Sequence, residues 1–169
     1  MEASSAEFCV PLQQLMNEHA SLRVDMILME ELTEDIEFES GPMVIGLFMQ
    51  LHLLVTAFNE KLKAHSLAEE EGLFPMMARH LEENTRTIET LEMEHKKVDQ
   101  HLFDFLTEAD RTGLTIDEDG AQTITVYAVQ ALTTLTQHFA NEEKVLFPLA
   151  EKVLTTNEKE ELVRLLQNQ

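Results

Sequence analysis

The chain has 169 residues, 44% of them hydrophobic, so we expect one globular domain with a proper core. Its 32 acidic and 12 basic residues give a formal charge of −20, which disfavours binding to nucleic-acid phosphates or anionic membranes and favours a small partner or a cation. A single cysteine, Cys9, rules out an internal disulfide and zinc-finger spacing, which favours a reducing compartment.

The start of the chain shows no basic segment followed by an apolar run, and we find no 18-residue apolar segment. We therefore expect neither secretion nor a membrane span, and we expect a cytoplasmic protein. Cys9 precedes the first expected helix and is interpreted as a free, inert thiol.

Apolar residues recur with helical period nearly everywhere, and glycines and prolines mark the breaks. The helices are expected at about 11–33, 42–71, 84–112, 117–147 and, as a tail, 156–166. Four long helices with short connections predict an all-α, up-down-up-down antiparallel four-helix bundle with a short extra C-terminal helix. We expect a single domain over 1–169, with the bundle at about 8–150 and the tail at about 156–167.

The expected helix ends follow from local signals. An acidic linker at 34–40 separates the first two helices, and the second should stop near Gly72 and Pro75. A short segment at 76–81 then bridges to the third helix, which Asn84 caps. The fourth helix should end before Pro148, and the tail helix should have Asn157 or Thr156 as its cap.

One pattern occurs twice, at 65–75 and at 138–148. Each copy begins with a histidine, places a glutamate four residues later and ends in Leu-Phe-Pro. His65 with Glu69, and His138 with Glu142, are i, i+4 pairs, which project from the same face of a helix one turn apart. An imidazole and a carboxylate from each of two helices suit a site for iron, manganese or zinc.

Each long helix carries an apolar seam with three- and four-residue spacing that one histidine interrupts. The four seam histidines are His19, His65, His95 and His138. On the fourth helix the seam continues through Glu142 to Val145 and Leu149. Buried polar groups need partners, because each one left without a partner costs about 2 kcal/mol or more.

The four histidines are also expected at one height in the bundle. His19 lies eight residues after Pro11 and His95 eleven after Asn84, while His65 and His138 each lie nine before a Leu-Phe-Pro phenylalanine. In an antiparallel bundle these positions fall roughly 12 to 17 Å from one common end, at ~1.5 Å per residue. Six ligands in that layer suffice for two metal ions bridged by the carboxylates.

The order of His19, His65 with Glu69, His95, and His138 with Glu142, together with the two Leu-Phe-Pro endings, resembles the hemerythrin-like, or HHE cation-binding, family over about residues 8–150. The resemblance implies a four-helix bundle with a non-haem di-iron centre, bridged by an oxo or hydroxo group, that binds oxygen, nitric oxide or related small molecules. It also implies that the two glutamates bridge the irons and that the histidines are terminal ligands.

The pattern departs from that of oxygen-carrying hemerythrins, which use five histidines, with a His-x-x-x-His pair on the third helix and an aspartate bridge on the fourth. Here Asp99 follows His95 at that spacing, and Glu142 stands at the bridge. Four histidines and two glutamates are more similar to iron-sulfur-cluster repair proteins and iron-sensing hemerythrin-like domains, although we expect no counterpart of the cysteine-bearing amino-terminal domain that the repair proteins carry. This similarity favours sensing, iron handling or nitric oxide chemistry over reversible oxygen carriage.

The remaining polar residues receive simpler interpretations. Asp99 shares a face with His95, and both a metal contact and an indirect role stay open. The other polar neighbours and histidines are expected at the surface: Glu70, Glu71, Glu143, His52, His80 and His101.

Several classes of function remain open. The protein is expected to bind or sense a diatomic ligand, or to handle iron. Alternatively, it acts as an enzyme that consumes nitric oxide or peroxide, or donates iron for cluster repair. A ferritin-like oxidase ranks last, because that family supplies Glu-x-x-His from two helices. In a purely structural alternative, the six polar residues are hydrogen-bonded core groups and bind no metal.

Overall fold

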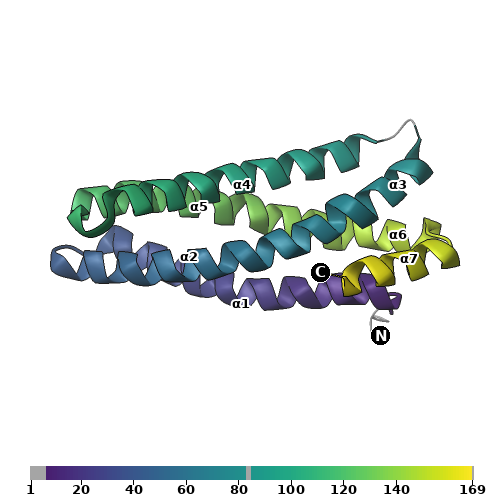
Figure 1. Ribbon diagram of the computed structural model, residues 1–169, viewed down its shortest axis with the longest axis horizontal. Helices are drawn as coiled ribbons and strands as arrows, with labels where there is room; N and C mark the ends of the chain where they lie inside the picture. Colours follow the sequence, from purple (N-terminus) through teal and green to yellow (C-terminus); the bar gives the residue numbers. More distant parts are fainter. Residues whose placement is uncertain (1–6, 83–84, 169) are drawn as a thin grey trace, which may run out of the picture.

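The computed structural model describes residues 7–82 and 85–168, and every regular element in these ranges is helical (Figure 1). The four long helices run alternately up and down the bundle and are α1 Val10–Phe38, α2 Pro42–Ala68, α4 Arg86–Thr112 and α5 Glu118–Asn141. The α1–α2 and α4–α5 connections lie at one end of the bundle, and the chain termini lie toward the other (Figure 1). The expected all-α antiparallel bundle with a short C-terminal helix is confirmed.

The first helix ends five residues later than expected, at Phe38. Its apolar seam continues through Met29, Thr33 and Ile36, which are buried, so the acidic residues of the expected linker are only the outward face of the same helix. The chain turns at Gly41, whose φ of 78° favours glycine. At the start of α4, Thr85 is the N-cap, and the expected cap Asn84 lies outside the described residues.

Helices α2 and α5 do not end at their Leu-Phe-Pro sequences. Each passes through one turn of π-helix, η1 (Glu69–Leu73) and η3 (Glu142–Leu146), and continues as α3 (Phe74–Leu81) or α6 (Phe147–Val153). The N–H groups of Phe74 and Phe147 bond to carbonyls five residues back. Each proline then falls in the first turn of the new α-helical segment, where a missing N–H costs least. The predicted stops near Gly72 and Pro75, and before Pro148, were therefore wrong.

The π-helical turn η3 also shifts the buried face of the fourth long helix by one residue. Val145, expected in the core, is 51% exposed, and Leu149 is only partly buried. Leu146, Phe147 and Ala150 are buried in their place. The extra residue in each wide turn rotates everything after Glu142 relative to a regular α-helix, so a constant 3.6-residue period cannot locate the core beyond it.

The tail helix α7 (Thr156–Gln167) packs onto the end of the bundle beside α1 and η1 (Figure 1). It begins where expected, but its cap is Thr155, which forms a capping box with Glu158. Gly72 in η1 provides the close approach, because a Cβ added there would lie 2.9 Å from Leu162 Cδ1.

Replacing Leu162 by alanine should lower the free energy of unfolding by about 2–4 kcal/mol, since a fully buried leucine is lost and α7 cannot collapse far onto η1. Urea unfolding followed by circular dichroism measures the change. Leu114→Ala is the control, because Leu114 is 99% exposed and its truncation should leave the midpoint unchanged. Equal midpoints for both variants would show that α7 adds no stability.

The continuous helix Pro42–Leu81 contains an 18-residue window of mean hydropathy 1.5, which is long and apolar enough to cross a membrane by length and composition. The expectation that the chain lacks an 18-residue apolar segment was therefore wrong. The same test is passed by core helices of soluble proteins, and this helix packs against α1, α4 and α5 and buries His65 and Glu69.

Candidate metal centre

Six polar side chains meet inside the bundle, and each of them is at least 95% buried. They come from all four long helices and from the π-helical turns that continue two of them. They are His19 on α1, His65 on α2, Glu69 at the start of η1, His95 on α4, His138 on α5 and Glu142 at the start of η3. One apolar cluster lies on each side of this layer along the bundle axis. The structure thus brings together all six residues predicted from the sequence.

The six residues form two overlapping groups that can each hold a metal ion. One contains His19 and His65, the other contains His95 and His138, and both glutamates belong to both groups. Within each group the potential ligand atoms lie within 4.8 Å of one another. Hereafter the first group is the α1–α2 half-site and the second is the α4–α5 half-site.

The histidines of each half-site point their Nε2 atoms at each other. His19 Nε2 lies 3.0 Å from His65 Nε2, and His95 Nε2 lies 2.9 Å from His138 Nε2. Both glutamates reach histidines of both half-sites. Glu69 Oε1 lies 2.7 Å from His65 Nε2 and 3.9 Å from His95 Nε2. Glu142 contacts His138 Nε2 directly and lies 3.7 Å from His19 Nε2.

Each histidine presents its other ring nitrogen, Nδ1, to a further carboxylate. His19 Nδ1 lies 2.7 Å from Glu143, and His95 Nδ1 lies 2.9 Å from Glu70. His138 Nδ1 is 2.7 Å from Glu94, and His65 Nδ1 is 3.5 Å from Glu18. An ionised carboxylate only accepts, so the three hydrogen bonds place the proton on Nδ1 of His19, His95 and His138 and leave their Nε2 lone pairs facing the centre. The Nδ1 of His65 is buried without a hydrogen bond.

Glu70 is exposed, as expected from the sequence, whereas Glu143 was expected at the solvated surface and is only 19% exposed. Neither carboxylate was expected to contact a histidine. Both follow the buried glutamates and enter the wide π-helical turn, from which they reach the histidine of a neighbouring helix. Glu18 and Glu94 were missed altogether. A signal for them does exist, because a Glu-His dipeptide occurs at both 18–19 and 94–95. Glu71 lies at the surface as expected.

The two central carboxylates have no adequate protein partner. All four side-chain oxygens of Glu69 and Glu142 are buried without a hydrogen bond, since the close contacts to histidine lack hydrogen-bond geometry. Burial and the negative charge of Glu69 raise the pKa of Glu142 well above its usual range. Burial opposes ionisation of Glu69 too, but the neighbouring His65 lowers its pKa. Buried carboxylates left in this state fit a cation well, because a cation neutralises both.

The surroundings of His19 and His138 favour the neutral imidazole. Burial and the neighbouring His65 lower the pKa of His19 to about 4, and burial together with His95 lowers the pKa of His138. Burial would also lower the pKa of His65, but the carboxylates of Glu69 and Glu18 raise it to about 9. Metal binding at neutral pH therefore has to displace a proton from His65.

Aromatic rings hold the histidines in place. Phe139 stacks on His19 with ring centroids 3.9 Å apart, and Phe147 lies 5.4 Å from the same imidazole. Phe74 lies 5.2 Å from His95. The phenylalanines of the two Leu-Phe-Pro sequences thus pack on histidines of neighbouring helices.

The other candidate residues lie outside the centre. Asp99 is exposed and belongs to neither group of potential ligands, although desolvation by neighbouring atoms and the charge of Glu70 raise its pKa. His52 pairs with Asp110 at 3.1 Å and His80 with Glu158 at 2.6 Å, both near the surface.

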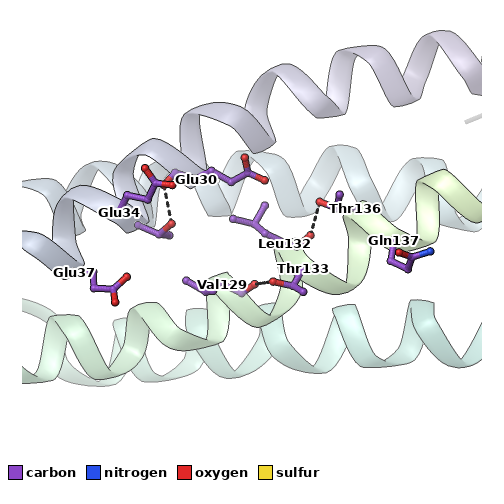
Figure 2. A pocket seen from close by; sticks show the side chains of 9 residues that line it. Glu30, Glu34, Glu37, Val129, Leu132, Thr133, Thr136 and Gln137 are labelled. Atoms are coloured by element: carbon purple, nitrogen blue, oxygen red, sulfur yellow. Dashed lines mark hydrogen bonds between the residues drawn. The ribbon is translucent and has the colours of Figure 1, made fainter.

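A large cavity, of about 740 Å³, opens between α1 and α5 and contains none of the six residues (Figure 2). Its rim carries Glu30, Glu34 and Glu37. The hydroxyls of Thr33, Thr133 and Thr136 that line it bond to carbonyls of their own helices (Figure 2). Since the three hydroxyls are bonded within their own helices and none of the six buried residues lines this groove, the buried layer is the candidate functional site.

An all-helical bundle with two overlapping buried groups of histidine and glutamate defines a class of metal-binding helical protein. The sequence matches the model of the hemerythrin HHE cation-binding domain over residues 10–150. The chain therefore belongs to this family, whose members bind cations, typically iron. No curated protein matches the chain.

Proposed function

We propose that this protein is a non-haem di-iron protein that binds or senses a small diatomic molecule, oxygen or nitric oxide, or handles iron, in the cytoplasm. The observation that supports two ions is that Glu69 and Glu142 belong to both groups of potential ligands. In this proposal Glu69 and Glu142 would be shared by the two irons, and His19, His65, His95 and His138 would be their other protein ligands. Imidazole and carboxylate donors also suit zinc or manganese, so iron rests on the family.

The protein's own groups would prepare the centre for its ligand. The carboxylates bonded to Nδ1 of His19, His95 and His138 fix the imidazole tautomer and orientation and increase the basicity of Nε2. Buried leucines around the layer restrict water, among them Leu15, Leu22, Leu62, Leu91 and Leu135. Two adjacent irons, when bound, supply coordination positions and electrons to a diatomic molecule small and apolar enough to enter.

The ligand set favours sensing, iron handling or nitric oxide chemistry over reversible oxygen carriage. Asp99 occupies the place where the oxygen carriers have a fifth histidine, and its carboxylate lies outside both ligand groups. This supports a place near the repair and iron-sensing branch of the family.

Stopped-flow absorption spectroscopy of the anaerobically iron-loaded protein, mixed separately with oxygen and nitric oxide, tests the proposal. Stable adducts at two irons per chain would support a sensor or carrier. Rapid consumption of nitric oxide or peroxide would instead support the enzymatic alternative. Elemental analysis that finds no bound iron after loading would overturn the di-iron proposal. His101→Ala should match the wild type, because His101 lies outside both ligand groups, whereas His138→Ala should lose iron.

A further inference from the structure

The two half-sites have the same ligands but different surroundings, and the difference shows when corresponding positions are compared. His19 and His95 each follow a glutamate, and each hydrogen-bonds through Nδ1 to the residue after a bridging glutamate. Four residues after these histidines, the α1–α2 half-site has Arg23 and the α4–α5 half-site has Asp99. The charge next to the supporting carboxylate is thus opposite in the two halves.

In the α1–α2 half-site, Arg23 binds the carboxylate that supports His19. Its two terminal nitrogens lie 2.6 and 3.1 Å from the oxygens of Glu143. The guanidinium also lies over the ring of Phe139, 5.6 Å from its centroid, and that ring stacks on His19. Arg23 therefore neutralises Glu143, draws its electron density away from His19 and closes this side of the centre. Glu143 is 19% exposed and His19 is fully buried.

In the α4–α5 half-site, Glu70 supports His95 without an arginine. Glu70 is 42% exposed and His95 4% exposed, so this side is more open than the other. Asp99 adds a second negative charge beside Glu70, and Lys63 is the cation whose charge also acts on Asp99. The position that corresponds to Phe139, directly after the other motif histidine, is Ser66.

We propose that the α4–α5 half-site binds the first divalent cation and the α1–α2 half-site binds the second more weakly, with Arg23 and Asp99 as the positioning residues that set this order. This inference rests on the proposed metal centre and states the order in which its two half-sites bind metal ions. A carboxylate on Nδ1 that is free to donate charge strengthens Nε2 as a ligand, whereas one held by a guanidinium does so less. Partners of this kind change metal affinity by about 10- to 100-fold.

Zinc titration tests the order, because Zn²⁺ needs no protection from air and suits the same ligands. Isothermal titration of the metal-free full chain should show two steps that differ by about tenfold or more in affinity. Crystals of protein loaded with half an equivalent of Zn²⁺ should show the anomalous zinc peak between His95 and His138. A peak between His19 and His65, or two steps of equal affinity, would overturn the order.

Two substitutions test whether Arg23 and Asp99 set the affinities of the two steps, or whether any change in the net charge of the protein has the same effect. Arg23→Gln should tighten the second step about tenfold and bring the two steps together, while Asp99→Asn should weaken the first. The controls are Arg111→Gln and Asp110→Asn, which change the same charges at exposed positions of α4 and should leave both steps unchanged. Controls that shift the steps as much as the test variants would also overturn the assignment. Failure to bind any Zn²⁺ would instead remove the metal centre itself, and this inference with it.

Discussion

Anaerobic Fe²⁺, kept free at a thousandfold above its dissociation constant, should raise the free energy of unfolding of the metal-free protein by about 4 kcal/mol for each ion bound. The reason is that the four oxygens of Glu69 and Glu142 are buried without hydrogen bonds. A cation bound only by the folded chain neutralises them, so binding energy becomes folding energy. Urea unfolding with and without the metal measures the difference.

This experiment has two kinds of control, removal of the iron by a chelator and substitution of single histidines. Chelation of the iron should return the unfolding midpoint to that of the metal-free protein. His138→Ala should lose most of the metal-dependent gain, whereas His101→Ala should retain it, since His101 is outside both ligand groups. Equal stability with and without metal in the wild type would mean that the six residues are ordinary core polar groups.

Replacing Glu142 by glutamine should have opposite effects on the metal-free and metal-loaded protein. Burial and the charge of Glu69 raise the pKa of Glu142, so the folded state holds a proton that the unfolded state releases above its ordinary pKa of about 4.5. Folding stability due to this group therefore falls as the pH rises above that value. Glutamine removes this cost, so the metal-free variant should be about 1–3 kcal/mol more stable at pH 7 and little changed at pH 4.

The same substitution should remove most of the stabilisation by Fe²⁺, because glutamine cannot supply the bridging charge. Unfolding at pH 4, 5.5 and 7, with and without metal, measures both effects. Glu71→Gln is the matched control, since Glu71 is an exposed glutamate within the other copy of the motif and belongs to neither ligand group. Loss of stability in metal-free Glu142→Gln at pH 7, or a full response to Fe²⁺, would contradict the prediction. A gain in stability with a loss of binding is what separates a functional carboxylate from a structural one.

The six central residues could be found from the sequence because local periodicity controls them. His65 and Glu69, or His138 and Glu142, lie one turn apart, and each of the four histidines interrupts an apolar seam. A helix buries the face that its apolar residues occupy, so polar residues on that face have to enter the core. The heights of the histidines followed from helix length and antiparallel order alone.

The sequence did not reveal the π-helical turns, and this error had consequences. Pro75 and Pro148 were interpreted as helix ends, and Val145 and Leu149 as core. A π-helical turn at Glu69 or Glu142 contains one residue more than an α-helical turn, and it changes the local hydrogen bonds only slightly. Whether the chain adopts that wider turn depends on how the following apolar residues pack, which involves residues distant in the sequence.

The sequence by itself determined the long helices, their apolar seams and the layer of imidazoles and carboxylates, because these depend on residues within one or two turns of each other. Only the tertiary structure decided which carboxylates support the histidines and which half of the centre faces Arg23 or Asp99. His19 and Glu143 are 124 residues apart, and His138 and Glu94 are 44 apart. Contacts of that kind depend on the rotation of each helix against its neighbours, and the π-helical turns and side-chain packing set that rotation.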